Sequence, residues 1–159
     1  MLLFISFVAA WAGDILLLKN DSTYFFLLAM LAFSVTHIFL VIIFYRIHKL
    51  KLSKAPEAFI GTLILGAICF EFYKFISPEL GSFKLPIIGY MVIICVMCIM
   101  AINLLGSSLR RQSAINYFIP GAALFILSDM VLASHKFVFK DLDFLPVIVI
   151  LSYGYAISL

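Results

Sequence analysis

The chain has 159 residues, of which 65% are hydrophobic and only 12% are charged. Its mean hydropathy of +1.22 corresponds to more apolar surface than a soluble domain can cover with polar groups, so we expect a membrane protein. The net charge of +3 is small and the basic residues are scattered between apolar runs, which argues against a nucleic-acid partner.

Six long apolar runs follow one another along the chain. A helix that crosses a bilayer needs about 20 mostly apolar residues, and six such helices with short loops account for the whole sequence. The predicted spans are residues 1–18, 24–45, 57–75, 85–105, 116–134 and 144–159. A β-barrel would instead show alternating segments of about 10 residues. We therefore predict an all-α fold, in which residues 1–159 form one polytopic transmembrane bundle of about six helices.

The loops between these spans suggest an orientation. The longest basic cluster, from Arg46 to Lys54, follows the second span, and Arg110 and Arg111 follow the fourth. These loops lie on the same side, and cytoplasmic loops are enriched in Lys and Arg. We expect this side and the N-terminus to be cytoplasmic, in a multi-pass protein of the plasma membrane or, in a bacterium, the inner membrane.

Three cysteines, Cys69, Cys95 and Cys98, all fall inside predicted spans. The last two form a CxxC pair, but a metal site would need further Cys or His residues nearby. We interpret all three as small packing residues and expect neither a metal nor another cofactor.

Two aspartates fall inside predicted spans, Asp14 in the first and Asp129 in the fifth. An ionisable residue there is costly unless it faces a protein partner or a wet cavity. The two helices run parallel, and both acids are predicted roughly 8–10 Å below the same membrane face. Small residues such as Gly13 and Ala122 share their helix faces, so we expect both acids to point into the bundle, where they could face each other. The alternative is that each acid only joins helices.

Other polar residues in the spans have simpler interpretations. His37 can hold a neighbouring hydroxyl or carry a proton, and alone it is more often structural. Glu71 and Lys74 have the spacing of an ion pair near a helix end. Asn103 is expected to hydrogen-bond between helices. Tyr90 is assigned to the aromatic belt at the membrane surface.

Three short motifs follow one another along the chain. The segment from Gly13 to Leu17 fits GD-x-x-L, Phe33 followed by His37 fits F-x-x-x-H, and the segment 121–129 fits GA-x-x-F-x-x-SD. In this order they resemble the motifs of the YhhN, or lysoplasmalogenase-like, membrane family. The third motif carries most of the resemblance, which covers nearly the whole chain.

The chain departs from the family pattern in two places. It looks as if it begins at the family's third span, so a Lys-Pro motif expected in the second has no counterpart. Near the C-terminus, Tyr153 and Ala156 fit a Tyr-x-x-Ala-Gln motif, but Ile157 stands where Gln is expected. If the absent helices form a wall of the site, we expect this chain alone to be inactive.

The resemblance implies a membrane hydrolase that cleaves the vinyl ether bond of lysoplasmalogen-type lysolipids. The products would be a fatty aldehyde and a glycerophospho-head-group alcohol. Asp14 and Asp129 are the implied acid and base, with His37 as a reserve proton carrier or orienting group. Two carboxylates suit this reaction, because one can protonate the vinyl ether while the other stabilises the cation or activates water.

Four further residues are expected to bind the lysolipid. Ser128 and Phe125 lie close to Asp129 in the sequence, and Lys19 and Lys136 would hold the phosphate at the membrane face. Besides the lysolipid and membrane lipids, the sequence indicates no partner, and it leaves the oligomeric state open. A small proton-coupled transporter that uses the two acids and His37 as a relay is the alternative function, and a non-catalytic membrane protein is a third.

Overall fold

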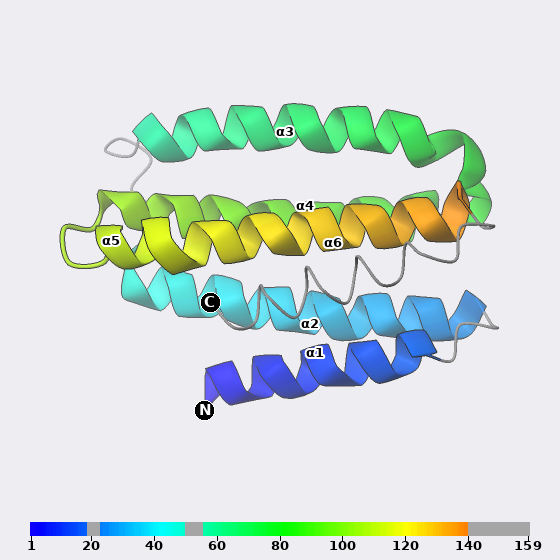
Figure 1. The fold of residues 1–159 in the computed structure, drawn as a ribbon, viewed down its shortest axis with the longest axis horizontal. Coiled ribbons are helices and arrows are strands. Elements are labelled where there is room, and N and C mark those ends of the chain that lie inside the picture. The colour runs from blue at the N-terminus through cyan, green and yellow to red at the C-terminus, as the bar shows by residue number, and fades with distance from the viewer. Residues whose placement is uncertain (19–22, 50–55, 140–159) are drawn as a thin grey trace.

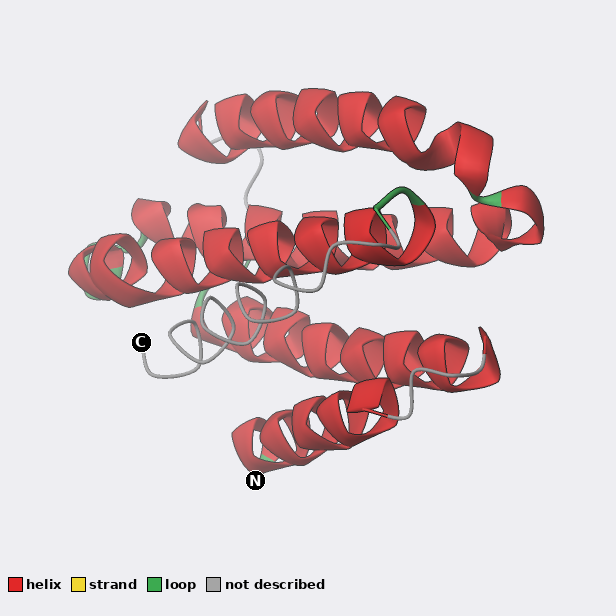
Figure 2. Cartoon of the chain, turned by 45° about the vertical axis from the view of Figure 1, so that its right-hand side comes forward, coloured by secondary structure: helices red, strands yellow, loops and turns green. Residues whose placement is uncertain are grey.

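The computed structural model describes residues 1–18, 23–49 and 56–139 of the chain. Every regular element in these ranges is helical and none is a strand, which confirms the all-α prediction (Figure 2). The elements are α1 (Leu2–Leu18), α2 (Thr23–Ile47), α3 (Pro56–Ile76), η2 (Ser77–Glu79), η3 (Gly81–Phe83), α4 (Lys84–Asn103), η4 (Leu104–Gly106), α5 (Arg111–Ser113), η5 (Ala114–Phe118) and α6 (Ile119–Phe137).

Four helical segments among the described residues are long and apolar enough to cross a membrane. They are Tyr24–Ile47, Phe59–Glu79, Gly81–Gly106 and Arg111–Phe137, and the shorter apolar helix Leu2–Leu18 accompanies them. Their outer faces expose large apolar side chains such as Phe4, Leu63, Val92 and Leu127, as contact with lipid requires. The protein is therefore an integral membrane protein. The predicted sixth span, residues 144–159, lies outside the described residues.

The long helices lie side by side with their axes roughly aligned (Figure 1). α1 packs on α2, α2 on α4, and α4 in turn contacts both α3 and α6. The colours of Figure 1 show that α1 and α6 run in the same direction, as predicted from the number of crossings. α1 is also tied to α2 by a hydrogen bond that the Thr36 hydroxyl donates to the Ser6 carbonyl, with an oxygen–oxygen distance of 3.2 Å.

The last described span begins earlier than the sequence predicted. Its helix starts at Arg111 and not at Asn116. A π-helical turn, Ala114–Phe118, joins the short helix α5 to α6. Pro120 has no amide hydrogen to donate to the carbonyl one turn before it, and the wider π turn accommodates this interruption. The polar residues before Asn116 made this segment resemble a loop, although a spanning helix can continue beyond the hydrocarbon region.

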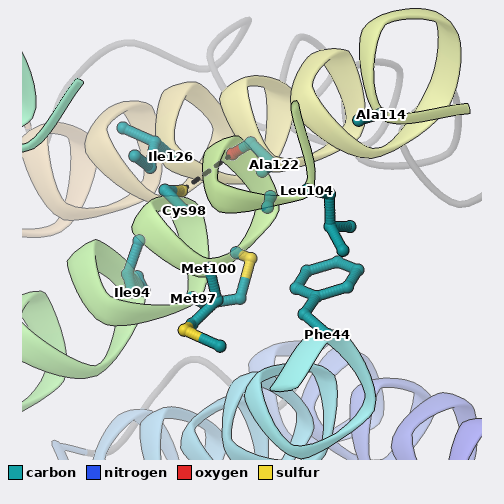
Figure 3. Close-up of a cluster of buried hydrophobic side chains, with 10 residues drawn as sticks. Phe44, Ile94, Met97, Cys98, Met100, Leu104, Ala114, Ala122 and Ile126 are labelled. Atoms are coloured by element: carbon teal, nitrogen blue, oxygen red, sulfur yellow. Dashed lines mark hydrogen bonds between the residues drawn. The ribbon is translucent and has the colours of Figure 1, made fainter. Parts of the chain in front are cut away.

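The buried apolar side chains form two clusters at different levels of the bundle. The first contains Phe44 of α2, Met97 of α4, Leu104 of η4 and Ala122 of α6 (Figure 3). Cys98 also belongs to it and donates a 3.7 Å hydrogen bond to the Ala122 carbonyl, which appears as the dashed line in Figure 3.

The second cluster gathers nearer the other end of the same helices. Its members are Phe26, Met30, Ile76, Leu80, Ile87 and Phe137. Along α2 and α6, the positions of His37 and Asp129 fall between the residues of the two clusters. The helices thus carry an ionisable pair at a level between two apolar layers.

Candidate active site

Three polar side chains from three helices meet inside the bundle. His37 of α2 is 1% exposed, and its Nε2 atom lies 3.7 Å from Oδ2 of Asp129 on α6, which is 17% exposed. The hydroxyl of Tyr90 on α4 lies 3.4 Å from the same Nε2 atom. A distance of 3.7 Å is too long for a hydrogen bond, so a small movement of either side chain would be needed to form one. We call His37, Tyr90 and Asp129 the polar cluster.

The surroundings of the polar cluster are aromatic and poor in hydrogen-bond partners. The ring of Phe125 packs edge-on against His37, with 5.5 Å between ring centroids. His37 Nδ1 and Asp129 Oδ2 are buried, and neither has a hydrogen-bond partner among the described residues. Such atoms are costly in a folded protein and call for an explanation, of which a catalytic role is one.

A small cavity of about 60 Å³ lies beside the polar cluster, between helices α1, α2, α3, α4 and α6. Asp129 and Tyr90 reach it, and the rest of its wall is mainly apolar, with Phe33, Met91 and Leu17 among the lining residues. A carboxylate is therefore presented to an apolar space inside the membrane span, where electrostatic interactions are stronger than in water.

Asp14 is half-buried on α1 and directly follows Gly13, which packs closely against Phe33 of α2. A Cβ atom at Gly13 would lie only 2.9 Å from the Phe33 ring, so the absence of a side chain allows the two helices to pack closely there. Leu17, one turn further along α1, reaches the small cavity. The direct pairing of Asp14 with Asp129 stays a prediction.

The two acids lie at different distances from the ends of their helices. At a rise of about 1.5 Å per residue, Asp14 is about 6 Å from the end of α1 at Leu18, and Asp129 is about 12 Å from the end of α6 at Phe137. The distance is longer for Asp129 because α6 continues to Phe137, beyond the predicted end at residue 134. The shared depth of the two acids stays a prediction.

A family model for the YhhN family matches residues 1–159. The chain belongs to the YhhN family. No curated protein and no solved structure matches it.

The three motifs that resemble the YhhN pattern converge in the folded chain. Gly13 of the first motif packs against Phe33 of the second. His37 of the second motif faces Asp129 of the third and also contacts Phe125. Segments on α1, α2 and α6 that are far apart in the sequence thus form one connected group in this YhhN protein.

The remaining predicted site residues of the YhhN chain lie near this group or towards the membrane surface. Ser128 is buried beside Asp129. Lys136 lies in the last turn of α6, with its Nζ atom 5.7 Å from the centroid of the Phe26 ring. Lys19 lies outside the described residues.

One interpretation of a polar pair away from the site is confirmed, because Lys74 Nζ and Glu71 Oε2 form an exposed ion pair at 3.2 Å. Asn103 of α4 donates a 3.3 Å hydrogen bond to the His48 carbonyl, which lies just after the end of α2. Asn103 therefore bonds to the segment that follows a neighbouring helix and not to the helix itself.

None of the three cysteines belongs to the polar cluster, although Cys69 lines the small cavity. Cys69 of α3 and Cys95 of α4 are free thiols with their sulfurs 2.9 Å apart, whereas Cys98 is directed to the Ala122 carbonyl. The CxxC pair therefore does not act as a unit. The described residues contain no group of three or more side chains that could hold a metal ion.

Tyr90 is the member of the polar cluster that the sequence did not identify. The sequence predicts a place in the aromatic belt for Tyr90, because this residue lies near the start of a predicted span and hence near the expected membrane surface. Its role depends on how α4 packs against α2, and neither its neighbours nor its spacing in the sequence carries that information.

Proposed function

We propose that this YhhN protein is a membrane hydrolase that cleaves the vinyl ether bond of lysoplasmalogen-type lysolipids, in the plasma membrane or a bacterial inner membrane. The observation that carries the proposal is the carboxylate of Asp129, which borders an apolar cavity within the membrane span and lies 3.7 Å from a buried imidazole. Ionisable side chains at such depth usually mark a functional site. The resemblance of the three motifs to those of the family supplies the reaction.

The reaction needs a proton donor, a means of stabilising a cation, and one water molecule. A carboxylic acid protonates the β-carbon of the vinyl ether, and the resulting oxocarbenium ion is attacked by water to give a hemiacetal. The hemiacetal collapses to an aldehyde and the glycerol hydroxyl, and the proton returns to the site. An ionised carboxylate in a low-dielectric site stabilises the cation and accepts the proton of the attacking water.

In this proposal Asp14 and Asp129 share the acid and base roles. Either carboxyl could donate the proton while the other accepts one from the attacking water, so the roles are assigned to the pair and not to one residue. His37 Nε2 is 3.7 Å from Asp129 Oδ2, close enough to orient that carboxyl and to exchange a proton with it after a small movement. The Tyr90 hydroxyl, at 3.4 Å, would hold the imidazole in position.

The lysolipid would enter with its phosphate at the end of the bundle where α6 finishes. Lys136 lies in the last turn of α6 there, and Lys19 follows α1 in the sequence. A lysine can hold a phosphate without requiring one bidentate geometry. The vinyl ether is a few atoms from the phosphate and would then reach the polar cluster, with Ser128 and Phe125 beside it.

A small proton-coupled transporter is the second candidate, because the Tyr90 hydroxyl and the Asp129 carboxylate both lie near His37 Nε2, and ionisable groups within a membrane span often carry protons. A relay across the membrane needs further groups that can carry the proton. A second and larger cavity, of about 330 Å³, is also lined by Phe125. It has no acidic, basic or histidine side chain among its described lining residues. This absence favours hydrolysis over transport.

Activity of matched variants in purified protein tests the proposal. The wild-type protein should release aldehyde from an alkenyl lysolipid, and Asp129→Asn and Asp14→Asn should each abolish release while the bundle stays folded. Glu71→Gln is the control, because it removes an exposed carboxylate at the end of α3 and should leave turnover unchanged. Normal turnover by either Asp variant would remove that acid from the mechanism.

A further inference from the structure

A second cavity, of about 330 Å³, lies between helices α1, α2, α4 and α6. Its lining includes Phe7 and Ala10 of α1, Leu40 and Phe44 of α2, Met97 of α4 and Ala122 of α6. We call it the large cavity. Its volume is at the lower end of the range of about 300–1,000 Å³ that is usual for pockets that bind small molecules.

The two cavities occupy different levels of the bundle. The large cavity uses the first half of α1, the second half of α2 and the beginning of α6, which lie at one end of the aligned helices (Figure 1). The small cavity uses the opposite halves, from Leu17 of α1 to Ala133 of α6. The large cavity is therefore further from the membrane face at which α1 and α6 end.

The polar cluster lies at the boundary between the two cavities. Asp129 and Tyr90 line the small cavity, whereas Phe125 and Thr36 line the large one. His37 follows Thr36 directly in α2 and packs against the Phe125 ring, so it lies between the linings of the two cavities. A chain that continues past the polar cluster, away from the membrane face at which α1 and α6 end, would run toward the large cavity.

We infer that the large cavity holds the hydrocarbon chain of a single-chain lipid whose reacting bond lies at the polar cluster. This inference rests on the proposed function and names where the chain is bound. The cavity has room for roughly ten groups the size of a water molecule, at about 30 Å³ each, and a methylene group is of similar size. It therefore accommodates an alkenyl chain segment of about that length.

The chemistry of the wall fits a hydrocarbon chain and not a head group. Two of its polar side chains already have partners, since the Ser6 hydroxyl donates to the Leu3 carbonyl at 2.8 Å and the Thr36 hydroxyl to backbone carbonyls at 3.2 Å. None of the described lining residues is charged. A phosphate or ammonium group would find no counter-charge there.

The selectivity of such a site would come from shape. A chain that leaves the bilayer for an apolar cavity gains little from the hydrophobic effect, because it exchanges one apolar environment for another. Its binding free energy becomes more favourable where the chain fills the space and makes dispersion contacts, and less favourable where the chain overlaps the wall. Turnover should therefore pass through an optimum in chain length.

Two adjacent alanines of α6 offer a matched pair for the test. Ala122 is buried and lines the large cavity, whereas Ala123 is exposed on the outer face. Ala122→Phe should lower kcat/KM for a long-chain alkenyl lysolipid by about tenfold relative to a short-chain one, and Ala123→Phe should leave the ratio unchanged. An unchanged ratio in a folded Ala122→Phe protein would overturn the inference.

A second measurement uses the wild-type chain and does not depend on catalysis. A saturated alkyl ether lysolipid with a diazirine at the end of its chain is bound, irradiated and mapped by mass spectrometry. The inference expects labels on the buried part of the cavity wall, for example at Phe44 or Met97. Labels confined to lipid-facing residues such as Leu127 would overturn it.

The two proposals can fail separately. Labelling of the cavity wall without aldehyde release from an alkenyl lysolipid would sustain the chain site and refute the hydrolase. Aldehyde release with labels only on the outer face would sustain the hydrolase and refute the chain site.

Discussion

Replacement of Gly13 by alanine tests how α1 is held beside the polar cluster. A Cβ atom at this position would lie 2.9 Å from two atoms of the Phe33 ring and 3.1 Å from a third, which is closer than such contacts normally allow. Gly66→Ala on α3 is the matched control, because a Cβ atom there meets nothing within 4 Å. Both substitutions add one methyl group to an apolar helix.

The expected loss of unfolding free energy in Gly13→Ala depends on how far the Phe33 ring can move. Overpacking a well-packed core by a methyl group costs about 1–3 kcal/mol. Phe33 is buried, but its ring borders the small cavity of about 60 Å³ and can shift into it. We therefore expect Gly13→Ala to lower the free energy of unfolding by about 1–2 kcal/mol, in the lower part of that range.

Reversible unfolding in detergent micelles measures this difference. Gly13→Ala should be destabilised and Gly66→Ala should match the wild type. Phe33→Leu should relieve the conflict, so the double variant should recover part of the loss, which a double-mutant cycle reports as coupling. Because Asp14 is the next residue, we also expect Gly13→Ala to reduce turnover. Equal stabilities of the two alanine variants, without coupling to Phe33, would refute the close packing of α1 on α2.

Three further substitutions probe individual contacts. Tyr90→Phe removes the hydroxyl that lies 3.4 Å from His37 Nε2, and it should lower kcat about tenfold with little change in stability; unchanged kcat would exclude a role in positioning the imidazole. Asn103→Ala removes the bond to the His48 carbonyl and should cost about 1 kcal/mol of unfolding free energy, measured in micelles. The Lys19→Ala, Lys136→Ala double variant should raise the apparent KM for the lysolipid more than it lowers kcat, and an unchanged KM would refute phosphate binding at this face.

Much of the fold followed from the lengths of the apolar runs. Continuous apolar segments fix the position of a spanning helix, and the predicted helices around His37 and Asp14 are present. Helix ends were less certain, because a helix can extend into the interfacial region where polar residues resemble a loop. Arg111 illustrates this, since the helix begins there and passes through a π turn before Pro120.

The candidate site could be predicted only in part. Ionisable residues in apolar runs singled out Asp14, Asp129 and His37, and the motif resemblance added a role for His37 beside the two acids. The contact of Tyr90 with His37 depends on the packing of α4 against α2, and the large cavity is the space that four helices leave unfilled. Such features arise from side-chain volumes in three dimensions and have no periodic signal in the sequence.

The source of the proton tests the central claim most directly. Purified protein is given an alkenyl lysolipid in D₂O, and the aldehyde is reduced at once to an alcohol to prevent later exchange. Protonation of the vinyl ether β-carbon predicts one deuterium on the carbon next to the former carbonyl carbon of the product. As a control for exchange, the same aldehyde incubated with Asp129→Asn protein should contain no deuterium. The matched saturated alkyl ether should give no product. Aldehyde that forms without this deuterium, or equal release from the saturated ether, would contradict hydrolysis by acid catalysis at the polar cluster.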